Sequence, residues 1–164
     1  MLFSTKAEYG VRLMVELGRR ATEAAPDEAR PVALSAVAEA EILPLSYLEH
    51  LVAKLRKAGL VASTRGAHGG YRLAMPAEEI TMDSVVEALE GQIAPMECFH
   101  EAPEGKVLCS HEDDGDHACA TKLLWTRVQS GVTKALAGTT LAELVEFGSP
   151  PAREKPLTTV GGAA

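Results

Sequence analysis

The chain has few aromatic residues and no long apolar run. Phe, Trp and Tyr make up 4% of its 164 residues, so the core must consist mainly of Leu, Val and Ala, a composition that favours helices. No run reaches the roughly 18 apolar residues that a membrane-spanning helix needs. The N-terminus, MLFSTKAEYG, lacks the apolar segment of a signal peptide. We therefore expect a cytoplasmic protein with no membrane partner.

Cysteine is equally scarce, and the three that occur are Cys98, Cys109 and Cys119. An odd number in a chain expected to be cytoplasmic argues against a disulfide framework. The thiols could be small buried hydrophobic groups. Their neighbours, such as Glu97 and His111, are polar, which favours a metal or redox role instead.

Common catalytic motifs are also missing. There is no phosphate-binding loop, no nucleophile elbow and no His-Glu-x-x-His pair. The acidic cluster of residues 112–116 does not match the register of a calcium-binding EF-hand loop. We expect that the protein is not an enzyme.

Charge is unevenly distributed along the chain. The net charge is −7 overall, yet residues 1–75 carry ten Lys/Arg against eight Asp/Glu, which leaves +2. Residues 76–164 carry six against fifteen, which leaves −9. The segment from Leu45 to Arg72 contains five basic residues and one acidic residue, Glu49, so its local net charge is +4. Because phosphate contacts depend on the local field, this segment is predicted to meet a polyanion.

The same segment has the order of a helix-turn-helix with a β-wing. A first helix is predicted over about 34–41 from the apolar residues Val37, Ala38 and Ile42, and Pro44 prevents its continuation. Ser46 and Glu49 form a capping-box pattern that opens a second helix, ending near residue 58 before a glycine. Its predicted inward residues are Leu48, Leu51, Val52 and Leu55. Residues 60–63 and 71–73 are predicted strands joined by a glycine-rich wing.

Further helices are predicted around this unit. Residues 4–20 carry a Ser4 or Thr5 cap and an apolar face of Tyr9, Leu13, Met14 and Leu17. Thr81 is predicted to cap a helix over about 82–90, and a capping box at Thr140 and Glu143 starts a last helix. Residues 92–118 show no helix or strand period, and a long helix spans about 119–136. The apolar stripe of that helix is Leu123, Leu124, Val128, Val132 and Leu136. A stripe without internal partners is typical of a homodimer interface.

The candidate DNA-contacting residues occupy the second helix and the wing. Ser46, Tyr47, Glu49 and His50 lie in the turn that enters the major groove in helix-turn-helix proteins. Glu49 could accept a hydrogen bond from cytosine and His50 could donate to guanine, although the capping box alone explains Ser46 and Glu49.

Arg65 in the wing suits a narrow minor groove, and Gly66 lets the turn approach the backbone. Lys6, Lys54 and Lys57 are candidate phosphate contacts. The alternatives are an exposed hairpin arginine and lysines that are simply solvated.

Over about residues 1–147 the chain resembles the IscR/NsrR/RirA-type winged-helix regulators. The segments that carry the resemblance are MLFSTKAEYG, LSYLEHLVAKLRKAGLV, STRGAHGGYRLA, ITMDSVVEALEG, the three spaced cysteines and KLLW. The resemblance implies a dimeric transcription factor that binds a double-stranded DNA operator. Many of its members carry an iron–sulfur cluster that senses redox state, iron supply or nitric oxide.

The resemblance also implies a ligand set. The cluster, [2Fe-2S] or [4Fe-4S], would be held by Cys98, Cys109 and Cys119, with Glu8 of the partner subunit as the preferred fourth ligand. IscR-like members have shorter gaps between the cysteines and a histidine just after the third. Lys122 stands at that position here, and a charged ammonium is not a ligand.

Alternatives remain open for both the ligands and the function. His111 or His117 could replace Glu8, and zinc could take the three cysteines with His100, His111 or His117. The rival functions are a zinc-bound or cluster-free thiol-redox regulator and a small iron–sulfur electron carrier.

The predicted fold class is mainly α with a small β-wing, a winged helix-turn-helix domain plus a long dimerisation helix. The predicted divisions are a DNA-binding domain (1–91), a cysteine loop (92–118), a dimerisation helix with a short last helix (119–147) and a disordered tail (148–164).

Overall fold

The computed structural model describes residues 3–23, 30–66, 68–93, 99–101, 107–109 and 119–149. The predicted disordered tail falls almost entirely outside these residues. In chain order the elements are α1 (Thr5–Glu23), α2 (Leu34–Glu41), α3 (Leu45–Lys57), β1 (Val61–Thr64), β2 (Gly70–Leu73), η1 (Ala77–Glu79), α4 (Met82–Glu90), β3 (Phe99–Glu101), β4 (Val107–Cys109), α5 (Lys122–Ala137) and α6 (Leu141–Gly148). The fold is mainly helical with a small antiparallel wing, as predicted.

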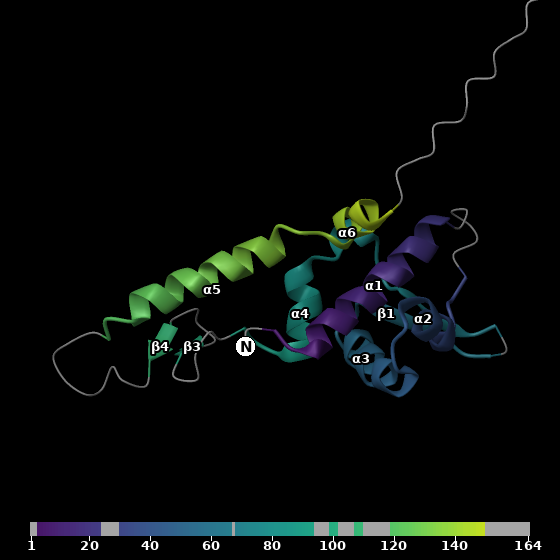
Figure 1. Cartoon of the computed structure of the whole chain (residues 1–164), viewed down its shortest axis with the longest axis horizontal. Helices are drawn as coiled ribbons and strands as arrows, with labels where there is room; N and C mark the ends of the chain where they lie inside the picture. Colours follow the sequence, from purple (N-terminus) through teal and green to yellow (C-terminus); the bar gives the residue numbers. More distant parts are fainter. Residues whose placement is uncertain are drawn as a thin grey trace, which may run out of the picture.

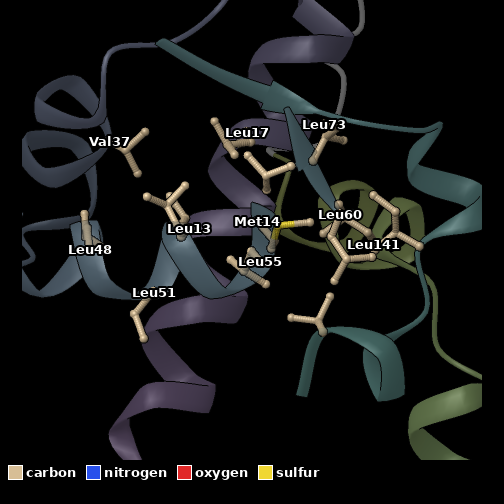
Figure 2. Close-up of a cluster of buried hydrophobic side chains, with 14 of the residues drawn as sticks. Leu13, Met14, Leu17, Val37, Leu48, Leu51, Leu55, Leu60, Leu73 and Leu141 are labelled. Atoms are coloured by element: carbon tan, nitrogen blue, oxygen red, sulfur yellow. The ribbon is translucent and has the colours of Figure 1, made fainter. Parts of the chain in front are cut away.

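Helix α1 lies at the centre of the fold and contacts α2, α3, α4, α6 and β2 (Figure 1). Its predicted apolar face is confirmed, because Leu13, Met14 and Leu17 are buried and point into the shared core (Figure 2). The hydroxyl of Ser4 accepts a hydrogen bond from the Lys6 amide at 3.1 Å, which caps the first turn. A Leu→Ala change in such a core costs about 2–5 kcal/mol.

Helices α2 and α3 form the predicted helix-turn-helix. Val37 is fully buried, but Ile42, the last apolar residue of the pattern that indicated this helix, is 89% exposed. The reason is its position: Ile42 is the C-cap of α2 in a left-handed conformation, with φ 55°, which turns the chain and directs Leu43 inward instead. The four predicted inward residues of α3 are all buried.

The predicted capping box at the start of α3 is also wrong. The N-cap is Pro44, and no side chain caps the helix. The amides of Tyr47 and Leu48 both donate to the Pro44 carbonyl at 3.1 Å, so Ser46 already lies inside the first turn. Gly59 follows α3 with φ +79°, and it ends the helix as predicted.

Strands β1 and β2 pair antiparallel, with Val61 opposite Leu73 and Thr64 opposite Gly70. The wing is tied to the helices through Val32, which bridges Tyr71. A Cβ at Gly70 would lie 2.4 Å from the Val32 carbonyl oxygen. Only glycine therefore permits this close approach, which sets the wing against the chain entering α2.

Helices α4 and α6 are joined at their N-termini. The Met82 amide donates to the Thr139 carbonyl at 2.9 Å, and the Leu141 amide donates to the Ile80 carbonyl at 2.8 Å. The predicted capping box of α6 is confirmed, since the Thr140 amide donates to the Glu143 carboxylate at 2.7 Å and the Glu143 amide donates to the Thr140 hydroxyl at 3.3 Å. Thr81 is the N-cap residue of α4, as predicted, but its side chain makes no cap hydrogen bond.

Helix α5 extends away from the winged unit (Figure 1). It contains no buried residue, and Leu123 and Leu124 are 62% and 54% exposed. The prediction of no strand between 92 and 118 is wrong, because β3 and β4 form a short antiparallel hairpin. The sequence signal was weak because each strand has only three residues.

Candidate DNA interface and cysteine hairpin

The recognition helix α3 presents one polar face to solvent. Ser46, Glu49 and His50 are exposed in its first turns, and Arg56 and Lys57 are exposed near its end. Because neither Ser46 nor Glu49 caps the helix, the structural role considered for them does not apply. Their side chains stand in the part of the helix that reads base edges in helix-turn-helix proteins.

Tyr47 lies differently from its neighbours. Its half-buried ring packs edge-on against Tyr9 of α1, with ring centroids 5.8 Å apart and an interplanar angle of 87°. Arg12 lies over the other tyrosine, 6.0 Å from the Tyr9 centroid, and pairs with Glu41 at 2.9 Å. Tyr47 therefore holds the start of α3 against α1. This aromatic contact, with Arg12 and Glu41, was missed by the sequence analysis because it joins residues far apart in the chain.

The tip of the wing carries the two predicted residues Arg65 and Gly66, both exposed. Gly66 has φ +117°, a conformation that side chains disfavour. The guanidinium of Arg56 donates to the Ser63 hydroxyl at 3.4 Å, which links the end of the recognition helix to β1. The exposed basic residues Arg56, Lys57 and Arg65 thus lie on two linked elements, α3 and the wing.

Two of the predicted phosphate-contacting lysines are engaged at the end of α4. Lys54 Nζ donates to the Leu89 carbonyl at 2.7 Å, and Lys6 Nζ lies 3.2 Å from Glu90 Oε2. Ser4 donates to the same Glu90 carboxylate from its amide, at 3.0 Å, and from its hydroxyl. A cation at a helix C-terminus is favourable. The end of α4 is therefore a junction between the recognition helix and the N-terminus of α1.

The Glu90 carboxylate has an altered pKa. Partial burial raises the pKa, but the hydrogen bonds from Ser4 and the hydrogen bond and charge of Lys6 outweigh it, so the net pKa lies below its ordinary value. The ionised form is thus favoured in the folded state. Its contribution to stability is present above the unfolded pKa and is lost as the pH falls through the lower folded pKa.

Replacing Glu90 by Gln should therefore change the pH dependence of stability. We expect the free energy of unfolding to fall most near neutral pH, and the difference from the wild type to shrink as the pH drops below the ordinary value of 4.5. Urea unfolding over this pH range measures it. Glu78→Gln, at an exposed carboxylate on η1, is the control. A difference independent of pH would contradict the role of the ionised carboxylate.

The candidate metal ligands are only partly within the described residues. Cys98, His111 and His117 lie outside them. Cys109 ends β4, where its backbone pairs with Phe99. Cys119 is half-buried just before α5, with its Sγ 3.3 Å from the Thr121 hydroxyl.

Glu8, which the resemblance suggested as a ligand from a partner subunit, is exposed on α1. In the part of the chain that the structure describes, no three His, Cys, Asp or Glu residues gather as metal ligands. None of the described helices is long and apolar enough to cross a membrane.

Comparison with known proteins gives this arrangement a family. A sequence model of the family Rrf2, described as "Iron-dependent Transcriptional regulator", matches residues 3–147. The chain belongs to the Rrf2 family. It is accordingly a DNA-binding transcriptional regulator and not an enzyme.

Individual relatives agree over almost the whole chain. Protein rrf2 of Nitratidesulfovibrio vulgaris is 35% identical over 91% of this chain and 90% of its own. The HTH-type transcriptional regulator IscR of Aliivibrio salmonicida is 37% identical over 88% of this chain and 77% of its own. The solved structure of CymR, described as the global cysteine regulator of B. subtilis, has a TM-score of 0.70 and 35% identity over 91% of this chain and 99% of its own. The predicted winged-helix fold is confirmed.

Proposed function

We propose that this Rrf2-family member is a homodimeric repressor whose operator affinity is set by an iron–sulfur cluster that senses redox state, iron supply or nitric oxide. In this proposal residues 1–91 bind DNA, residues 92–118 form the cysteine segment and residues 119–147 dimerise. The observation that carries it is the register of the β3–β4 hairpin, which places Cys109 opposite Phe99. Phe99 directly follows Cys98 in the chain.

The hairpin makes the cysteines suitable as joint ligands. Paired residues of antiparallel strands have Cα atoms about 4.5–5.5 Å apart, and the peptide bond to Cys98 adds at most about 3.8 Å. The pairing therefore supports a joint role for two cysteines that are separated by ten residues in the sequence. Cys119 lies three residues before the start of α5 and is half-buried. Three thiolates with one oxygen ligand suit an iron–sulfur cluster, which would supply reversible electron transfer.

The exposed position of Glu8 supports its role as the fourth ligand from the partner subunit. It precedes Tyr9, whose ring contacts Tyr47 of the recognition helix. A carboxylate is a more labile ligand than a thiolate, which suits a sensor. For Glu8 to act as a ligand, the start of α1 must be held in a fixed position. The hydrogen bond from Ser4 to Glu90 of α4 fixes it.

A second candidate is a cluster-free regulator that senses through thiol oxidation, or one that binds zinc through the same cysteines. The similarity to CymR, which is described as a cysteine regulator, favours it. Both candidates share the fold and the DNA interface. They differ in what the three cysteines bind.

Metal content distinguishes the two candidates. Protein purified anaerobically should be brown, absorb visible light, and contain iron and acid-labile sulfide. Cys119→Ala should lose this absorption, whereas Ala120→Ser, at an exposed neighbouring position, should keep it. A colourless wild-type protein with one zinc per chain, or with no metal and a thiol that oxidises reversibly, would replace the first candidate by the second.

The DNA interface is tested by Arg65→Ala and Glu49→Ala. A dimer should bind a roughly palindromic site with half-sites about 34 Å apart. Arg65→Ala should weaken binding through the minor groove, and Glu49→Ala should relax base preference at one position per half-site by about 1–3 kcal/mol. Titrations at one fixed salt concentration measure both effects. Equally tight wild-type binding to random duplex would contradict base readout, and Glu78→Gln serves as the control.

A further inference from the structure

Ile42 has an unusual backbone conformation. Its φ and ψ are 55° and 48°, and among the described residues it is the one non-glycine residue with positive φ. For a β-branched side chain this left-handed conformation is a true outlier, because the Cβ crowds the following carbonyl.

The surrounding structure imposes this conformation on the chain. The Leu43 amide bonds the Ala38 carbonyl at 2.9 Å, and Leu43 is buried, so the chain must reverse at residue 42. Arg12 reinforces the turn through the Glu41 carboxylate, at 2.9 Å, and the Glu41 carbonyl. Glycine would adopt the same conformation without strain.

The strain is not offset by packing within the chain. The side chain of Ile42 is 89% exposed, and Leu45, three residues later, is 40% exposed. With Pro44, also exposed, they form an apolar surface that we call the turn patch. A strained residue that contributes no packing to its own fold suggests a role in binding.

The turn patch adjoins the face that reads DNA. It leads directly into the exposed first turns of α3, where Ser46, Glu49 and His50 stand, and no charged residue lies between Ile42 and Ser46. The apolar group that the major groove offers is the C5-methyl of thymine.

We propose that Ile42 is a specificity-determining residue that packs against a thymine methyl group in each half-site. The inference rests on the proposed docking of α3 in the major groove, and adds an apolar contact to the polar ones.

The test exploits opposite effects on stability and on binding. Ile42→Gly relieves the strain and should raise Tm by about 2–4 °C. The same change should weaken binding about tenfold or more to a duplex selected by the wild-type protein from a random pool, because the apolar contact is lost. Ile42→Asn, which tolerates the left-handed conformation, should behave alike, whereas Ile42→Val should resemble the wild type.

Uracil in place of thymine removes only the C5-methyl group. When the thymines of the selected duplex are replaced one at a time, the wild type should lose the same affinity at one position per half-site. The affinity of Ile42→Gly should not change when that thymine is replaced. Phe147→Ala, which removes a 92% exposed apolar side chain on α6, is the control. This variant should bind the thymine duplex and the uracil duplex with the same affinities as the wild type.

Unchanged affinity of Ile42→Gly, or an equal loss on the thymine and uracil duplexes, would overturn the proposal. Failure of the docking itself would instead appear as unchanged binding by Arg65→Ala and Glu49→Ala.

Discussion

Val128→Asp is expected to dissociate the proposed dimer. Helix α5 projects from the winged unit with no buried residue of its own, and Val128 lies half-buried on its apolar stripe. If a second copy covers this stripe, an aspartate there becomes a buried, unpaired charge, at a cost on the order of several kcal/mol. Sedimentation velocity should show a monomer or an aggregate in place of a dimer.

The control for this prediction lies on the same helix. Ser130→Asp adds the same charge at an exposed position of α5, and should remain dimeric. Because two half-sites are read together only by a dimer, Val128→Asp should also lose operator binding. A soluble dimer of Val128→Asp that still binds its operator would refute the placement of the interface on this stripe.

The sequence predicted the helices well where the apolar period matched a packed face. The inward residues of α1 and α3 are buried as expected, since a helix around one core must place every third or fourth residue toward it. The glycine that ends α3 and the capping box at Thr140 were also predicted correctly. These features depend on contacts within a few residues of the chain.

The errors arose where a distant or competing contact decides the local structure. Ser46 and Glu49 have the same spacing as Thr140 and Glu143, yet the helix starts two residues earlier than that pattern implies, because the Pro44 carbonyl accepts the hydrogen bonds of its first turn. The turn after α2 exposes Ile42 because Leu43 takes the inward position.

The candidate site shows the same division. Exposure of Glu49, His50 and Arg65 followed from the sequence, because polar residues on an amphipathic helix or at a wing tip face solvent. The anchoring of Lys54 on Leu89 could not be predicted, since nothing in the sequence brings the end of α4 to α3. The β3–β4 register was likewise missed, because its strands are too short for an alternating pattern to show.

In the proposed function, the junction at the end of α4 couples the cysteine segment to the DNA interface. Leu89 accepts a hydrogen bond from Lys54 of the recognition helix, and Glu90 is held by Ser4 and Lys6 of the segment that opens α1. After Glu90 the chain leads from Gly91 toward Cys98. In the proposed function, a change in how the cysteines are held would act on the residues that fix the spacing of α3 against α1.

Cys109→Ala is accordingly expected to change operator affinity without touching the DNA interface. Losing one ligand should shift the population of two arrangements of the junction, and a coupling of about 1–3 kcal/mol would alter affinity about 5- to 150-fold. The measurement compares anaerobic wild type in reduced and oxidised states, metal-free wild type and Cys109→Ala, all on one duplex at one salt concentration. The metal-free wild type and the variant should coincide, because both lack the ligated segment. Identical affinities in all four samples would mean that the cysteines do not regulate DNA binding.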